Sequence, residues 1–285
     1  MINFFRIYKA ILTILVLPVI FNQYFHRATG SQYGVSYLDK IILMFKMVRN
    51  NYRIPSASGF LEHLAMAAKI LNIPKSIKGC LIECGSFKGG SSANLSLVSS
   101  LCHRKLVIFD SFKGLPQPQT DDKAHLIIDL GQIHTYAKGA WYGSLEEVRR
   151  NVARLGDISV CEFKKGYFKQ TLPKFDQGCV FIFLDVDLIE SVKTCLKNLW
   201  PKLETGGYLF THEAHHMEIA SLFFDKLWWK KNLASAPPGL IGAGNGLGLV
   251  ADSDGFKSSI GYTIKNPNIK KFDKQSQNGY EKTNS

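Results

Sequence analysis

Residues 83–92 are Glu83-Cys84-Gly85-Ser86-Phe87-Lys88-Gly89-Gly90-Ser91-Ser92, and they continue an apolar run that starts at residue 80. The glycines let the backbone approach a ligand closely, and Ser91 or Ser92 can cap a helix that begins here. The N-terminus of such a helix offers free N–H groups to a bound molecule. A strand, a glycine turn and a helix in this order predict a ligand site at the end of the first strand of an α/β sheet.

The rest of the chain repeats this alternation of apolar runs and helix-length stretches. The runs are mostly apolar without alternation, which is typical of strands covered on both faces; they are Cys80–Cys84, Lys105–Asp110, Ile158–Phe163, Cys179–Asp185 and Tyr208–Thr211. Helix candidates lie between and after them, at Ser91–Leu101, Ser144–Leu155, Glu190–Leu203 and Ile219–Lys230. The pattern predicts a Rossmann-like α/β fold with a doubly wound, mostly parallel sheet and ligands at the carboxyl ends of its strands. One or two further strands are expected after Gly255.

Two amphipathic helices are expected ahead of the sheet, at Tyr37–Arg49 and Phe60–Leu71, as an N-terminal helical cap. A chain of 285 residues, 46% of them hydrophobic, can bury one sizeable core and has little room for a second ordinary domain. We therefore divide the chain into an N-terminal segment at 1–35, the helical cap at 36–78, the α/β domain at 79–265 and a polar basic tail at 266–285.

The start of the chain is basic and then apolar, since Arg6 and Lys9 precede an apolar stretch at 10–21. This is the outline of a signal peptide, but no small-x-small cleavage site follows it. The stretch is also shorter than the roughly 20 residues that span a bilayer. A membrane-surface anchor, an uncleaved signal and a helix that packs on a partner subunit all remain open for this segment.

The formal net charge of +12 is concentrated at the two ends of the chain, with +6 in residues 1–53 and +4 in residues 256–285. The middle of the chain is nearly neutral, which argues against a nucleic-acid groove on the folded domain. The six cysteines form no CxxC pair, and most of them lie in apolar runs. They indicate buried thiols in a reducing compartment, so we expect a cytoplasmic protein, with membrane association left open.

The carboxylate of Glu83 decides between the cofactors that such a fold can bind. The G-x-G-x-x-G spacing of a dinucleotide site is missing, and a carboxylate at the strand end would repel a pyrophosphate. An acid at this position suits S-adenosylmethionine, which carries an ammonium and a sulfonium. Asp110 ends the second strand, where a carboxylate can accept hydrogen bonds from both ribose hydroxyls of any adenosine cofactor.

Four linked motifs, in the right order over roughly residues 36–250, resemble the macrocin O-methyltransferase family. They are Glu83-Cys84-Gly85 with Lys88-Gly89-Gly90-Ser91, then Asp110-Ser111-Phe112-Lys113-Gly114-Leu115-Pro116, then Gly166-Tyr167-Phe168 with Thr171-Leu172-Pro173, and Leu184-Asp185-Val186-Asp187-Leu188 with Glu190-Ser191. The resemblance implies a class I methyltransferase domain at 79–265 that binds S-adenosylmethionine and methylates a hydroxyl, typically on a sugar of a natural product. It also implies a homodimer or higher homo-oligomer.

The resemblance also implies roles for individual residues around the cofactor. Glu83, Gly85 and Gly89 would line the methionine end, with Ser86 and Ser91 beside them in the same loop. Asp110 would hold the ribose. The adenine side would be formed by Ser111, Phe112, Tyr167 and Phe168.

A divalent metal is usual in the family, and Asp185 stands where its first carboxylate ligand is expected. The family follows its fifth strand with two adjacent aspartates, but here His212 and Glu213 take their place. A metal set of Asp185, His212 and Glu213 would shift the preference from magnesium toward manganese, iron or zinc. Alternatively the metal is lost and His212 acts as a base or fills space. Asp187 is expected to cap the helix that starts near Glu190.

A base must take the proton of the acceptor hydroxyl. The stretch 117–143 is too long for a passive connection and suits a lid, and within it we favour His134 as the catalytic base, beside Asp185 and His212. Residues 212–216 also match H-E-x-x-H, but His212 directly follows a strand and no third ligand pattern continues, which disfavours a zinc protease.

The sequence therefore predicts an S-adenosylmethionine-dependent O-methyltransferase acting on a small hydroxylated acceptor. The alternative is a membrane-associated binding protein that kept the fold without the chemistry. An NAD-dependent oxidoreductase is disfavoured by Glu83.

Overall fold

The computed structural model describes residues 21–122, 125–127, 132–242 and 260–266. Its centre is a six-stranded sheet in the order β5-β2-β1-β6-β7-β8. The strands are β1 (Cys80–Cys84), β2 (Leu106–Asp110), β5 (Cys161–Lys165), β6 (Cys179–Leu184), β7 (Leu203–Thr211) and β8 (Gly261–Ile264). All neighbours are parallel except β8, which runs antiparallel to β7. The predicted doubly wound, mostly parallel sheet is confirmed.

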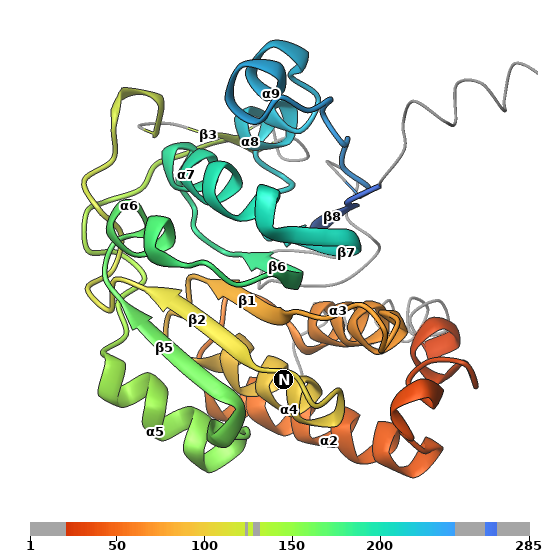
Figure 1. Ribbon diagram of the computed structural model, residues 1–285. Helices are drawn as coiled ribbons and strands as arrows, with labels where there is room; N and C mark the ends of the chain where they lie inside the picture. The colour runs from red at the N-terminus through yellow and green to blue at the C-terminus, as the bar shows by residue number, and fades with distance from the viewer. Residues whose placement is uncertain (1–20, 123–124, 128–131, 243–259, 267–285) are drawn as a thin grey trace, which may run out of the picture.

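Helices cover both faces of the sheet (Figure 1). One layer holds α2 (Tyr37–Arg53), α3 (Phe60–Asn72), α4 (Gly90–Leu101) and α5 (Leu145–Leu155). The other holds α6 (Phe168–Thr171), α7 (Ile189–Leu199), α8 (Met217–Leu222) and α9 (Lys226–Leu233). A separate hairpin of β3 (His125–Ile127) and β4 (Gln132–His134) lies near α8.

The hydrophobic core has two parts, one on each face of the central strands. Along β1, Leu81 belongs to the apolar cluster under α2, α3 and α4, whereas Ile82 belongs to the cluster under α7. The same alternation places Phe183 in the first cluster and Ile182 in the second. Because β1, β2 and β6 have helices on both sides, their apolar residues are buried at every position, which explains the continuous runs in the sequence.

The switch point of the sheet lies between β1 and β6. From β1 the chain proceeds outward to β2 and β5, and then returns to β6 and proceeds the other way. The loops after these two central strands therefore part in opposite directions and leave a crevice at their carboxyl ends. Residues at the ends of β1, β2 and β6 line it.

The predicted helical cap is present as α2 and α3. Helix α2 begins with a capping box in which Ser36 and Asp39 bond each other's backbone N–H groups, and it packs on α3 and α4. The short stretch 21–25 is helical as well, and its Tyr24 is buried with its hydroxyl donating to the Lys40 carbonyl.

Several predicted boundaries were wrong. Residues 158–160 form a 3-10 turn, so β5 starts only at Cys161. Helix α7 ends at Leu199, because Pro201 follows within a 3-10 turn, and β7 already begins at Leu203. The helix expected at Ile219–Lys230 is two helices, because Asp225 caps α9 as a separate element.

Two predicted segments lie largely or wholly outside the described residues. These are the basic and apolar start of the chain up to residue 20 and the polar tail from residue 267. Within the part of the chain that the structure describes, no helix is long and apolar enough to cross a membrane.

Candidate active site

The glycine turn after β1 lies against the loop that follows β6. Gly85 has φ +88°, and a Cβ placed on it would meet the Asp185 carbonyl oxygen at 1.8 Å. No other residue type fits such an approach of two backbones. Gly89 has φ +87° and is the N-cap of α4, and Phe87 between them also has a positive φ, of 45°. The turn is therefore set by contact with the strand-end loop as well as by its own geometry.

Glu83 lies beneath this turn and is completely buried. Its two carboxylate oxygens accept hydrogen bonds from the hydroxyls of Ser91 and Ser92, each at 2.5 Å. Burial raises the pKa of Glu83 to about 8, against the opposing effect of these two hydroxyls. The expected direct contact of Glu83 with a cationic ligand finds no support in this position, because the side chain joins β1 to the start of α4 instead of lining the crevice.

Asp110 holds the glycine turn from the neighbouring strand. One oxygen accepts from the backbone N–H of Ser86 at 2.7 Å and from its hydroxyl at 3.0 Å, and the other accepts from the N–H of Phe112 at 2.6 Å. Burial raises the pKa of Asp110, while these donors act in the opposite direction. Asp110 thus ties the ends of β1 and β2 together while it faces the crevice.

A cavity of about 320 Å³ fills the crevice at the ends of β1, β2 and β6. Five of the ten predicted cofactor residues line it: Gly85, Asp110, Ser111, Tyr167 and Phe168. The other five do not; they are Glu83, Ser86, Gly89, Ser91 and Phe112. Phe112 was expected on the adenine side, but it packs with Val148 in an apolar cluster next to α5. Its φ of 52° turns the side chain into that cluster.

The predicted lid contributes one wall of the cavity. Trp141 lines the cavity and contacts Phe87 edge to face, with ring centroids 5.5 Å apart. Gly143 is so close to the glycine turn that a Cβ would meet the Phe87 carbonyl oxygen at 1.9 Å. The end of the long connection is thereby fastened to the loop after β1. Phe87 was not singled out as a cavity residue from the sequence.

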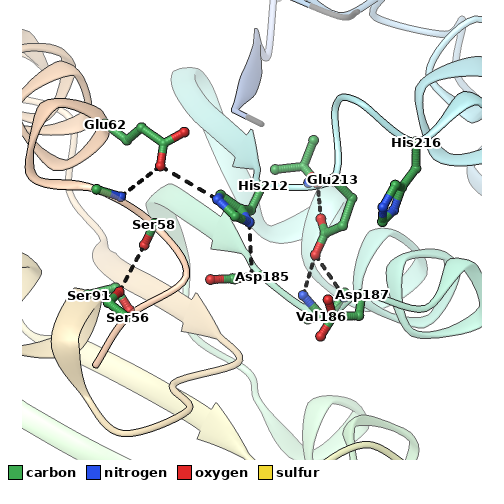
Figure 2. A network of polar contacts seen from close by, with 12 residues as sticks. Ser56, Ser58, Glu62, Ser91, Asp185, Val186, Asp187, His212, Glu213 and His216 are labelled. Carbon is green, nitrogen blue, oxygen red and sulfur yellow. Dashed lines mark hydrogen bonds and ion pairs between the residues drawn. The ribbon is translucent and has the colours of Figure 1, made fainter. Parts of the chain in front are cut away.

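At the ends of β6 and β7, His212 lies between two carboxylates (Figure 2). Its Nδ1 is 3.4 Å from Asp185 Oδ1, and its Nε2 is 3.5 Å from Glu62 Oε2. Burial alone would lower the pKa of His212, but the carboxylates of Asp185 and Glu62 raise it well above 6.5. The predicted proximity of Asp185 and His212 is observed, whereas Glu62, which comes from the helical cap, was not anticipated.

Glu213 forms its hydrogen bonds with groups other than Asp185 and His212. One oxygen accepts from the backbone N–H groups of Val186 and Asp187, and the other accepts from the Thr211 hydroxyl. Asp185, His212 and Glu213 therefore do not converge on one point, and among the described residues no group of three His, Cys, Asp or Glu side chains could hold a metal ion. The residues present do not fit the expected divalent metal.

Asp187 is the carboxylate that the sequence analysis assigned to a helix cap, and that assignment was wrong. Leu188 is the N-cap of α7 and makes no side-chain cap bond. Asp187 has φ +60° and lines the cavity. Burial, followed by the charges of Asp185 and Glu213, raises the pKa of Asp187 well above its ordinary value, and a hydrogen bond with Tyr136 acts against this. A left-handed backbone at a non-glycine residue costs energy and is concentrated at functional sites.

His134, the predicted base, lies on β4 away from the cavity lining. It is exposed and contacts the ring of Tyr136, with centroids 4.6 Å apart. The same hairpin holds the buried His125, which stacks on His216 at 5.0 Å. His216 is the N-cap of α8, so the two histidines of the H-E-x-x-H pattern do not share a helix. This geometry agrees with the exclusion of a zinc protease.

Comparison with known proteins identifies a family for this chain. Residues 59–235, more than half of the chain, match the family model described as Macrocin-O-methyltransferase (TylF). A curated relative, 8-demethyl-8-(2,3-dimethoxy-alpha-L-rhamnosyl)-tetracenomycin-C 4'-O-methyltransferase of Streptomyces olivaceus, is 34% identical over 138 residues, 47% of this chain and 52% of the relative. Demethyldecarbamoylnovobiocin O-methyltransferase of Streptomyces niveus is 31% identical over 147 residues, 50% of this chain and 55% of the relative.

The chain thus spans about half the length of the curated relatives it matches. Among solved structures, the O-methyltransferase NovP aligns with a TM-score of 0.48 at 20% identity, covering 92% of this chain and 99% of that one. The sheet, the motifs along its strand ends and the matched family model lead to the same assignment: this chain belongs to the macrocin O-methyltransferase family.

Proposed function

We propose that this protein transfers the methyl group of S-adenosylmethionine to a hydroxyl of a small acceptor, a sugar or a related natural product. Family membership supports this reaction, and the two curated relatives are named as O-methyltransferases. The observation that carries the proposal is Asp187, a half-buried carboxylate with a raised pKa that lines the cavity next to the glycine turn.

The cavity fits an adenosine donor with positive charge. After accepting from Ser86 and Phe112, the carboxylate of Asp110 keeps lone pairs for ribose hydroxyls. Tyr167 and Phe168 offer apolar surface to a base, and the carboxylate of Asp185 provides negative charge for the ammonium and the sulfonium. When bound, S-adenosylmethionine supplies an electrophilic methyl carbon.

The protein must then bind, orient and deprotonate the acceptor. A neutral hydroxyl is a poor nucleophile, so its proton would pass to the Asp187 carboxylate as the oxygen bonds to the methyl carbon. The carbon–sulfur bond would break in the same displacement, with S-adenosylhomocysteine as the leaving group. The raised pKa of Asp187 makes it a better proton acceptor at neutral pH than an ordinary aspartate. Trp141 and Phe87 close one side of the cavity and exclude water from the reacting atoms.

Asp187→Asn tests this role. The amide keeps the shape of the side chain but cannot take the proton, so we expect kcat to fall about 100-fold or more, with S-adenosylmethionine affinity kept within about threefold. Turnover is followed as methyl transfer from radiolabelled S-adenosylmethionine to methyl α-L-rhamnoside and to other glycosides. Asp121→Asn is the matched control, because Asp121 is exposed and does not line the cavity.

Unchanged turnover in Asp187→Asn would remove the assigned base. Binding of S-adenosylmethionine by the unaltered protein without transfer to any acceptor would instead favour the non-catalytic alternative.

The same proposal covers the cellular compartment of the protein and its partners. The six cysteines, all free and five of them buried, support a reducing, cytoplasmic setting. Leu38, Ile42 and Phe45 are exposed along one face of α2, which supports either a homo-oligomer or a peripheral membrane contact. The N-terminal membrane segment stays a prediction, and no nucleic-acid partner is proposed.

A further inference from the structure

The contacts of His212 with two carboxylates bear on whether this site can hold a divalent metal. His212 presents Nδ1 to Asp185 and Nε2 to Glu62, at 3.4 and 3.5 Å (Figure 2). At these distances the contacts are ion pairs, longer than most hydrogen bonds. A neutral ring would direct the lone pair of one nitrogen at a carboxylate oxygen, so a position between two carboxylates favours the imidazolium form.

Both carboxylates are held in place by the backbone around them. Glu62 is completely buried, and its Oε2 also accepts from the Gly59 N–H at 2.9 Å, as the capping residue of α3. Asp185 follows β6 directly, its N–H donates to the Cys84 carbonyl at 2.9 Å, and its own carbonyl rests against Gly85. The imidazole ring thus sits between two fixed negative groups that come from the helical cap and the sheet.

A second cation next to this ring would be unfavourable. A divalent ion on Asp185 would lie within a few ångströms of a buried positive charge, and like charges at that distance repel strongly in a partly desolvated site. Glu213, the remaining expected ligand, already uses both oxygens for Val186, Asp187 and Thr211. Moving it toward a metal would leave two buried N–H groups without their acceptor, which is costly.

We propose that the ring of His212, clamped between Glu62 and Asp185, takes the place of a divalent cation, so that this protein carries out its methyl transfer without a metal. Glu62 is then a positioning residue that acts through His212. The role in catalysis rests on the proposed function, whereas the occupation of the site by the ring is a property of the folded chain alone. The two parts are tested separately.

The first test measures Mn²⁺ binding to the unreacted protein by electron paramagnetic resonance and calorimetry. We expect no binding by the unaltered chain at micromolar Mn²⁺. His212→Asp replaces the ring by a carboxylate beside Asp185 and Glu62, and we expect it to gain Mn²⁺ affinity by about tenfold or more. His103→Asp makes the same change at an exposed position after α4, at the other end of the sheet, and we expect no gain there.

The second test measures turnover. We expect the unaltered protein to keep its rate after EDTA treatment and with no added metal. Glu62→Gln keeps an acceptor for Gly59 but removes the charge that faces His212, so we expect kcat to fall about 10- to 100-fold with KM for S-adenosylmethionine nearly unchanged. Glu62→Asp, which restores the charge, should recover part of the rate.

Stoichiometric Mn²⁺ binding by the unaltered chain, with turnover that EDTA abolishes and Mn²⁺ restores, would overturn the proposal. A folded His212→Asp protein that still takes up no Mn²⁺ would also overturn it, and if that variant does not fold, the binding measurement on the unaltered chain decides alone. Failure to bind S-adenosylmethionine would instead contradict the proposed function, and the Mn²⁺ result could still be interpreted without it.

Discussion

Gly85 is the residue at which the active-site geometry is most tightly constrained. We expect Gly85→Ala to destabilise the fold by about 3 kcal/mol or more and to abolish S-adenosylmethionine binding, because the added Cβ overlaps the Asp185 carbonyl. Gly34→Ala is the control, since Gly34 also has a positive φ, of +74°, but a Cβ there meets nothing within 4 Å. That variant should lose only about 1 kcal/mol in denaturant unfolding and keep its binding. Equal losses in the two variants would show that backbone strain, not the contact with Asp185, sets the effect.

Glu83 gives the fold a dependence on pH. Its pKa is about 8 in the folded protein against an ordinary value of 4.5, so the native state holds a proton that the unfolded chain releases. The resulting stability is fully present below about pH 4.5 and is lost as the pH rises through about 8, a change on the order of a few kcal/mol.

Glu83→Gln keeps partners for Ser91 and Ser92 without a titrating group, so its melting temperature should fall less between pH 5 and pH 9 than that of the unaltered protein. Parallel curves for the two proteins would contradict a raised pKa at Glu83.

At the scale of elements, a buried polar chain joins α2 and α3 of the helical cap to α4. Asn94 on α4 accepts from Asn50 of α2 at 2.9 Å, and its amide lies 2.7 Å from the Nδ1 of His63 on α3. The other ring nitrogen of His63 lies 2.8 Å from the Ser58 hydroxyl. Burial lowers the pKa of His63 to about 4, so the ring is neutral and offers one donor and one acceptor. Three helices are thereby fixed around one amide.

Asn94→Ala would remove the partner of Asn50 Nδ2 and of His63 Nδ1 on α4, while Asn50 keeps the Leu155 carbonyl and His63 keeps the Ser58 hydroxyl. We expect the loss of these two buried hydrogen bonds to cost about 3 kcal/mol in the free energy of unfolding. Asn198→Ala is the control, because that amide bonds only the Thr194 carbonyl one turn earlier on α7 and is half-buried; it should cost less than about 1 kcal/mol. Chemical denaturation of both variants checks the difference. A similar, small loss in both would show that the chain through Asn94 does not couple the cap to the sheet.

The elements also show how far sequence reasoning extends. β1 was predicted with its observed bounds, because a strand buried on both faces is a short apolar run between polar turns. The division into α8 and α9 was missed, since apolar spacing continues across Asp225 and only the cap bond from its side chain to Trp228 marks a new helix. Asp187 was misassigned for a related reason, because Asp is a common helix cap and its left-handed backbone cannot be read from composition.

At the scale of the whole molecule, the cavity depends on segments far apart in the chain. The ends of β1, β2 and β6 supply Gly85, Asp110 and Asp185 to its lining, and the long connection supplies Trp141. Asp185 in turn contacts His212 at the end of β7, which pairs with Glu62 of the cap. Motifs at strand ends predicted five lining residues because strand ends in a parallel sheet converge. The pairing of Glu62 with His212 could not be predicted, since no sequence spacing relates a cap helix to the fifth parallel strand along the chain.

The predicted domain boundary at residue 78 follows a change in the apolar pattern of the sequence. It separates Glu62 in the helical cap from His212, its partner at the end of β7. Removing residues before 79 would take away Glu62 and expose the apolar faces of α4 and the sheet that now pack against α2 and α3.

Calorimetric titration of the unaltered protein with S-adenosylmethionine and, separately, with NAD⁺ is the most direct measurement. We expect one saturable site for S-adenosylmethionine, competed by S-adenosylhomocysteine and absent in Gly85→Ala, with no heat from NAD⁺. Saturable NAD⁺ binding together with no uptake of S-adenosylmethionine would contradict the assignment of the cavity to a methyl donor.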